Sequence, residues 1–173
     1  MARRRWSLHL ALCGAAALAL AGCGGSGSSA SSGPTKAQYV AKADAICKAA
    51  GEKTAPLISK LVAGGAGLAS GSASAARELE PVVAKVHEYA AASLTQLRAL
   101  QRPKGEASAI EKFLSPLSNV VGAAGQAASS LSSGQGSAAL GLLAQVQTEA
   151  QQATKAAGAY GVAPCGSVVA ALG

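Results

Sequence analysis

Apolar and small side chains recur at spacings of three and four along most of the chain after residue 34. This is the period of a helix that buries one face. Four segments carry it. Their stripes are, in chain order, Tyr39, Ala43, Ile46, Ala50, Leu57 and Leu61; Leu79, Val83, Val86, Ala90, Ser93, Leu97 and Leu100; Ile110, Leu114, Leu117, Val121, Ala124, Ala128 and Leu131; and Ala139, Leu143, Val146, Ala150, Ala153, Ala157 and Tyr160. The pattern predicts four helices.

Segments rich in glycine, proline and serine separate the stripes at 63–72, 101–106 and 132–137. Such segments are typical of loops, so we expect three connections there. The second and third are short, which requires neighbouring helices to run antiparallel. The prediction is an all-α domain, an up-down-up-down four-helix bundle with left-handed crossings.

Three residues indicate where the helices begin or bend. Thr35 is placed to cap the first helix. Pro56 lies within the first stripe and is expected to kink or interrupt the helix, because proline has no amide hydrogen and crowds the preceding turn. Pro81 is compatible with the second helix only within its first turn, so we expect that helix to begin just before it.

The N-terminal segment 1–22 has the features of an export signal. Three arginines precede an apolar run of 14 residues from Leu8 to Ala21, which is shorter than the ~20 residues that a membrane span needs. The run ends in Leu-Ala-Gly-Cys at 20–23, which resembles a bacterial lipobox. That resemblance implies that the Cys23 thiol receives diacylglycerol and that a signal peptidase cuts before it.

The domain organisation follows from this segment. Residues 1–22 are the signal peptide, 23–34 the lipidated cysteine with a Gly/Ser-rich tether, and 35–173 the helical domain. A flexible tether of ten residues reaches roughly 17 Å, and acyl chains on one cysteine anchor a protein by burying methylenes at ~0.8 kcal/mol each. We expect a protein lipid-anchored to the cell membrane on its extracytoplasmic face. Twelve basic and eight acidic residues then remain, a net charge of +4.

Removal of the signal and acylation of Cys23 leave two of the four cysteines, Cys47 and Cys165. Export places them in an oxidising compartment, where such a pair most simply forms a disulfide. The bond would close a long loop and stabilise the fold by up to ~4–5 kcal/mol. The alternative is two free thiols, one of which pairs with another chain.

Three short motifs carry a family resemblance. They are "YVAKADAICKAA" at 39–50, "LRALQRPKG" at 97–105 and "YGVAPCG" at 160–166. Together with the lipobox they resemble an uncharacterised group of actinobacterial envelope lipoproteins, marked by an early Ala-Asp-x-Ile-Cys and a late Gly-x-x-x-Cys-Gly. The resemblance implies an envelope lipoprotein with a helical domain and supplies no activity. This chain departs from the group in its "SVVAALG" ending and its many internal glycines.

Asp44 lies three residues before Cys47, on the same side of the first helix. One hypothesis makes its carboxylate a structural clamp that accepts hydrogen bonds from amides of the returning segment 164–167. The other makes it an exposed partner of Lys48 at i,i+4, worth ~0.3–0.5 kcal/mol. The sequence favours neither.

The remaining ionisable residues indicate no chemistry. His87 would be the one histidine of the mature chain, so a zinc set is excluded and a position at the edge of a helix seam is favoured. The acidic residues of the second helix, Glu78, Glu80 and Glu88, follow no catalytic spacing. The lysines of the first helix, Lys36, Lys42, Lys48, Lys53 and Lys60, are interpreted as a solvated face. We expect no catalytic site, metal or cofactor.

These observations favour a membrane-anchored, non-catalytic binding or scaffolding module for another envelope protein. The alternative is a carrier of a small apolar or lipid ligand, held between helices where small side chains leave room. Export and the scarcity of aromatic residues exclude a nucleic-acid partner. An enzyme ranks third.

Overall fold

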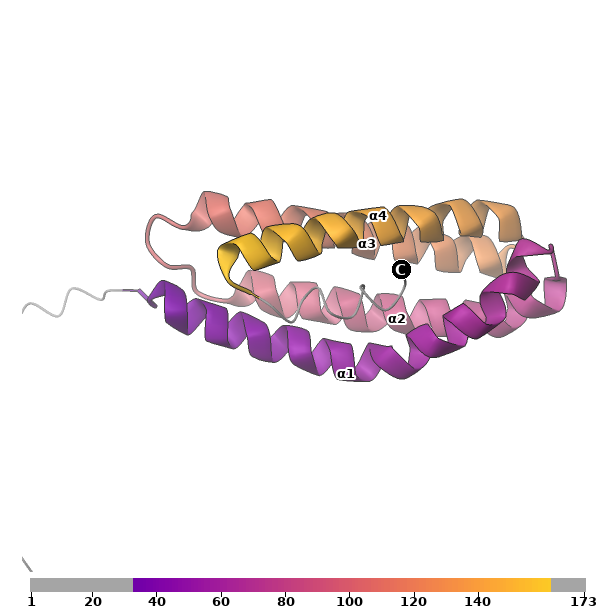
Figure 1. Ribbon diagram of the computed structural model, residues 1–173, viewed down its shortest axis with the longest axis horizontal. Coiled ribbons are helices and arrows are strands. Elements are labelled where there is room, and N and C mark those ends of the chain that lie inside the picture. The colour runs from indigo at the N-terminus through magenta and orange to yellow at the C-terminus, as the bar shows by residue number, and fades with distance from the viewer. Residues whose placement is uncertain (1–32, 163–173) are drawn as a thin grey trace, which may run out of the picture. The chain divides into compact units, whose positions relative to one another are not determined.

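The computed structural model describes residues 33–162 and shows four helices in this range (Figure 1). The first two are α1 (Lys36–Ala69) and α2 (Ala73–Ala99), and the last two are α3 (Ala107–Ser132) and α4 (Gly136–Tyr160). The described residues contain no strand. The all-α prediction is therefore confirmed.

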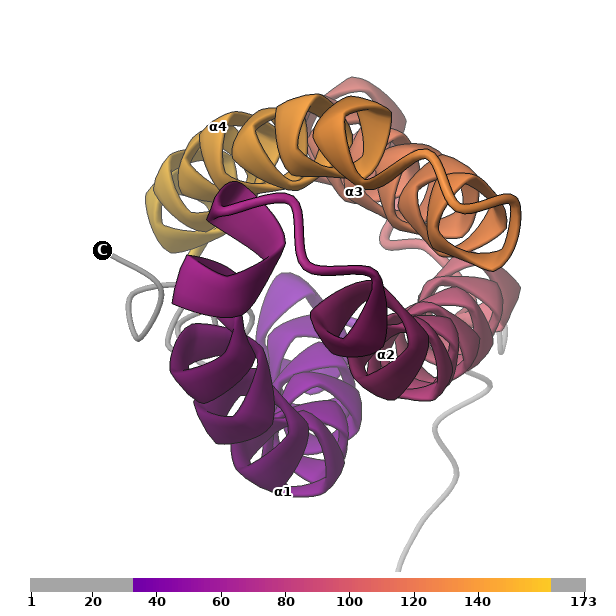
Figure 2. The same ribbon diagram turned by 90° about the vertical axis from the view of Figure 1, so that its right-hand side faces the viewer.

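Each helix packs against the next along the chain, and consecutive helices run in opposite directions (Figures 1 and 2). The α3/α4, α1/α2 and α2/α3 interfaces are extensive, whereas α1 and α4 make few contacts. Seen along the helices, α1 and α4 are the first and last members of the ring (Figure 2). The up-down-up-down bundle is confirmed, and its loosest side lies between α1 and α4.

Thr35 caps the N-terminus of α1, as the sequence predicted. The Thr35 hydroxyl accepts a hydrogen bond from the Gln38 amide at 3.2 Å, and the Gln38 side chain accepts one from the Thr35 amide at 2.9 Å. This reciprocal pair satisfies two amides that the first turn of a helix leaves without partners. The expected start of α1 is confirmed.

Glycine ends α4 in a left-handed turn. Gly161 has φ of 104°, and the amide of Val162 returns to the carbonyl of Ala157 at 2.9 Å. This bond closes the last turn of α4. The positive φ favours glycine at residue 161, because a side chain would be strained there. Gly71 and Gly134 turn the chain in the same way after α1 and α3.

The segment 63–72, expected as a loop, is mostly helical: α1 continues through it and leaves a connection of three residues to α2. Its glycines serve close packing between helices. A β-carbon at Gly64 would lie 2.7 Å from the Leu79 side chain, and one at Gly67 would lie 2.9 Å from Cβ of Ala75. The loop prediction was wrong because glycine was interpreted as a helix breaker at positions where it lets two backbones approach.

The other two connections lie near their expected positions. Residues 100–106 join α2 to α3, as the proline and glycine pattern predicted. The loop expected at 132–137 is shorter, because α3 includes Ser132 and α4 already begins at Gly136.

Both prolines considered above lie inside helices. Pro56 does not interrupt α1, which bends about halfway along its length (Figure 1). Pro81 is eight residues beyond the start of α2 at Ala73, so the expectation of a first-turn position was wrong. Both prolines are exposed. Water can therefore hydrogen-bond the carbonyl four residues earlier, which lacks its helical donor.

Two clusters of buried side chains form the core, one toward each end of the bundle. The cluster near the start of α1 contains Tyr39, Ile110, Phe113, Leu114 and Tyr160, and the other contains Leu68, Leu79, Val83, Leu131 and Ala139. Phe113, absent from the predicted stripe, is completely buried. The region between the clusters is less well filled.

Candidate functional site

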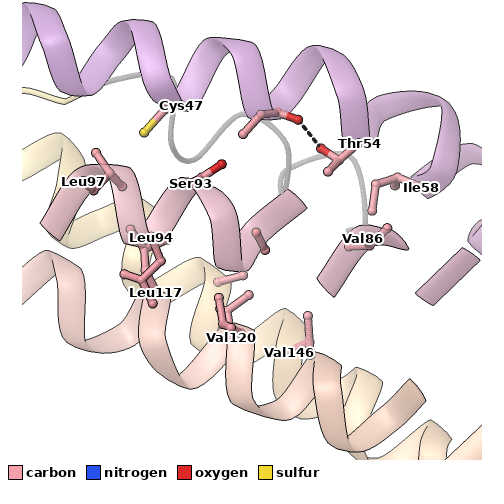
Figure 3. A pocket seen from close by; sticks show the side chains of 14 residues that line it. Cys47, Thr54, Ile58, Val86, Ser93, Leu94, Leu97, Leu117, Val120 and Val146 are labelled. Atoms are coloured by element: carbon pink, nitrogen blue, oxygen red, sulfur yellow. Dashed lines mark hydrogen bonds between the residues drawn. The ribbon is translucent and has the colours of Figure 1, made fainter. Parts of the chain in front are cut away.

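A cavity of about 120 Å³ lies between the two core clusters and is lined by residues of all four helices (Figure 3). Cys47 and Ile58 contribute from α1, Leu97 from α2, Leu117 from α3 and Val146 from α4. Figure 3 shows these side chains around one space in the bundle interior. The lining is aliphatic apart from the cysteine and two hydroxyls.

A second cavity of about 290 Å³ lies next to the first, on the side of the α1–α2 connection. The two cavities share three lining residues, Ile58, Val86 and Val146, which we call the waist. Val62 also lines the second cavity and is 61% exposed. The second cavity therefore reaches the surface beside Val62.

Side-chain size accounts for the space. Ala50, Ala90 and Ala150 face the first cavity from three different helices, and an alanine fills less of a helix interface than the leucines at the two ends. Packed cores leave few voids larger than a water molecule, so cavities of this size are departures from ordinary packing.

The two hydroxyls in the lining are already hydrogen-bonded within their own helices. Thr54 donates to the Ala50 carbonyl at 3.0 Å (Figure 3), and Ser93 donates to the Tyr89 carbonyl at 2.8 Å. Both donors are thus used, and the interior surface offers an apolar molecule dispersion contacts and shelter from water. The cavity suits an apolar occupant.

Cys47 is 3% exposed and faces this cavity. Its predicted partner Cys165 lies outside the described residues, as does Cys23. The disulfide and the lipidation therefore stay predictions.

Asp44 is half-buried on α1. Its Oδ1 is inaccessible to water and has no hydrogen-bond partner among the described residues, and no ion pair joins it to Lys48. The hypothesis of an exposed pair with Lys48 is therefore not supported. The clamp hypothesis involves 164–167, which lie outside the described residues, and it stays a prediction.

His87 lies at the α2/α3 interface, half-buried, as the sequence favoured. Its Nδ1 is 3.0 Å from the carbonyl oxygen of Val121. Because a carbonyl only accepts, Nδ1 carries the hydrogen in this contact. The bond holds two helices together and gives His87 a structural role.

An aromatic cluster closes the end of the bundle where α1 begins. The ring of Tyr160 stacks on Phe113 and meets Tyr39 edge-on, with 5.9 Å between centroids in both pairs. Lys36 covers the Tyr160 ring at 4.4 Å. Burial, followed by the negative charge of Glu106, raises the pKa of Tyr160 to about 12.

Charged residues on the outer face of α1 and α2 form local contacts. Lys85 bonds Glu88 at 2.7 Å, and Lys53 and Lys85 both lie over the ring of Tyr89, at 5.5 and 5.1 Å. The carboxylates of Glu88 and its neighbours on α2 do not gather into a site. Among residues 33–162, no group of three His, Cys, Asp or Glu side chains could hold a metal ion.

Most residues that line the first cavity belong to the four predicted apolar stripes, where they were expected to form a packed core. Val86, Ala90 and Val146 were predicted to pack against their neighbours, and they surround space instead. Ile58, the third waist residue, was missed, because the stripe of α1 was drawn through Leu57. Three alanines at the same level of three helices are the one signal that could have indicated the cavity.

No family model, no curated protein and no solved structure matches this chain. In the described part, no helix combines the length and the apolar character needed to cross a membrane.

Proposed function

We propose that this protein is a lipid-anchored, non-catalytic binding module on the extracytoplasmic face of the cell membrane, and that it holds a small apolar molecule between its helices. The observation that supports a ligand is the pair of neighbouring, mostly apolar cavities inside the bundle, the second of which reaches the surface beside Val62. Apolar pockets with few polar groups are the usual sites of small ligands.

This geometry favours a ligand carrier over a scaffold for another envelope protein. A protein-docking face normally exposes several large apolar side chains. In the described part of the chain, the exposed large apolar side chain is Val62, and it lies at the mouth of the cavity. The space available for a partner is thus inside the bundle.

The anchor follows from the sequence and has a direct test with a matched control. Cys23→Ser should abolish incorporation of radiolabelled palmitate and release the protein from the membrane fraction. Cys13→Ser lies in the same signal segment, but bulky Leu12 precedes it, so labelling and membrane attachment should persist. Equal labelling of both variants would show that Cys23 is not the lipidated residue.

The ligand is tested on full-length mature protein purified in mild detergent. Denaturing the protein and analysing the organic extract by mass spectrometry should reveal an apolar molecule in near-stoichiometric amount, beyond the anchor itself. The emptied protein should bind phenylnaphthylamine, an apolar dye that fluoresces out of water. A clean extract together with absent dye binding would contradict the carrier function and restore the scaffold hypothesis.

A further inference from the structure

We propose that the ligand is a molecule with a single unbranched alkyl chain, such as a fatty acid, which lies along the bundle from the mouth at Val62, through the waist, toward Cys47. This inference rests on the proposed carrier function and specifies its ligand class. The shape, length and polarity of the two cavities support the choice of an alkyl chain.

Shape favours a narrow ligand. The side chains that line both cavities, Ile58, Val86 and Val146, belong to three different helices and stand between the two spaces. Two of these side chains are valines, which have little χ1 freedom and cannot easily swing aside. A ligand that uses both cavities must pass this waist. A fused ring system is wide along its whole length, whereas an unbranched alkyl chain is the narrowest apolar ligand and bends at each bond.

Length favours a chain over a compact molecule. From the Val62 mouth to Cys47, the lining residues of α1 span roughly 22 Å at the helical rise of 1.5 Å per residue. One acyl chain spans about half of the ~30 Å hydrocarbon core of a bilayer, or roughly 15 Å, so an extended chain covers the larger part of this path and a compact molecule does not. The two cavities together have a volume within the ~300–1,000 Å³ typical of ligand sites.

The apolar lining of the first cavity determines which end of the ligand points inward. Thr54 and Ser93, deep in the first cavity, already donate their hydrogens to carbonyls of their own helices. A carboxylate or head group placed there would lose its hydration without finding new hydrogen-bond donors, which strongly disfavours its burial. The polar group of the ligand therefore stays in water at the Val62 mouth, and the alkyl end lies near Cys47.

The test measures how well saturated fatty acids from octanoate to stearate displace phenylnaphthylamine from the delipidated full-length mature protein. Each methylene buried in the cavity is worth up to ~0.8 kcal/mol, so affinity should rise by as much as about fourfold per carbon until the chain fills both cavities. A tetracyclic sterol should displace the dye poorly. Dye binding without dependence on chain length, or displacement by the sterol at fatty-acid concentrations, would overturn the alkyl-chain inference but leave the carrier function standing.

A bulky side chain at the waist tests whether the alkyl chain of the ligand passes between the two cavities. Val146→Phe should leave short chains bound in the mouth half and lower the affinity for stearate at least tenfold, so that affinity stops rising with length. Val82→Phe is the matched control, because Val82 lines a groove between α1 and α2 and lines neither cavity. Circular dichroism checks folding, and Ile58→Phe repeats the block from α1 if Val146→Phe does not fold. Unchanged length dependence in a folded waist variant would place the chain elsewhere.

Discussion

The imidazole of His87 lies against the bare backbone of Gly125 across the α2/α3 interface. A β-carbon at residue 125 would come 2.9 Å from Cε1 of the ring and 3.2 Å from its Nδ1. That Nδ1 already bonds the Val121 carbonyl at 3.0 Å, so the ring cannot withdraw without losing the bond. His87 and Gly125 thus form one packing unit.

Gly125→Ala should therefore destabilise the protein, although alanine favours helices. Forcing the ring away costs about 1–3 kcal/mol, against a helix-propensity gain of up to ~1 kcal/mol. Gly122→Ala, one turn earlier in α3, has nothing within 4 Å of the new methyl group and should stabilise by the full gain. Urea unfolding of both variants provides the measurement. Equal stabilisation of the two would mean that His87 can move freely.

The glycines near the end of α1 allow the same comparison. A methyl group at Gly67 would meet Cβ of Ala75 at 2.9 Å, whereas one at Gly65 would meet nothing within 4 Å. Cβ of Ala75 moves only with its backbone, so Gly67→Ala should separate α1 from α2 and lower the melting temperature. Gly65→Ala should raise it slightly. A rise in both variants would indicate that this end of α1 does not pack closely on α2.

These glycines also show why the fold was predictable and one boundary was not. The four stripes gave the number and order of helices correctly, because the spacing of Leu, Ile and Val depends on the helix alone. The segment 63–72 was misassigned, because a glycine that breaks a helix and one that admits Leu79 look identical in sequence. Only the partner helix, which is distant in sequence, distinguishes them.

The cavity depends on still more distant information. Whether Ala50, Ala90 and Ala150 leave space is decided by how far apart three helices lie, which no single stripe contains. The sequence did indicate that small side chains leave room between helices. It could not place that room at the waist, nor reveal that α1 and α4 pack loosely beside it.

Tyr39→Phe should leave the protein as stable as before, or more stable. The Tyr39 side chain is buried, and its hydroxyl has no hydrogen-bond partner among the described residues. A buried polar group without a partner costs roughly 1–3 kcal/mol, and phenylalanine preserves the edge-on contact with Tyr160. Thermal unfolding measures the change, and Tyr39→Leu, which removes the ring, should destabilise. A fall in melting temperature for Tyr39→Phe would reveal a partner for the hydroxyl.

Stability should fall at alkaline pH. Burial raises the pKa of Tyr39 above its usual value and that of Tyr160 to about 12. The folded state thus holds these protons more tightly than the unfolded state, in which tyrosine titrates near pH 10. The resulting stabilisation is complete below about pH 10 and is lost as the pH rises through about 12. Urea unfolding across this range gives the slope, and Tyr160→Phe should flatten it. A slope equal in both proteins would contradict the prediction.

The predicted Cys47–Cys165 disulfide should supply a large part of the stability. Cys165→Ala should lower the free energy of unfolding by up to ~4–5 kcal/mol, because the bond would close a loop of more than 100 residues. Cys165 is the residue to replace, since Cys47 is buried against the cavity and its loss would also change packing. Reductant should destabilise the parent protein and leave the variant unaffected, which separates the effect of the bond from that of the side chain.

Thiol titration tests the bond directly. With Cys23 replaced by Ser in the mature protein, Ellman's reagent should find no thiol after unfolding without reductant. Two titrating thiols would disprove the bond, and a dimer on a non-reducing gel would show that the cysteines pair between chains.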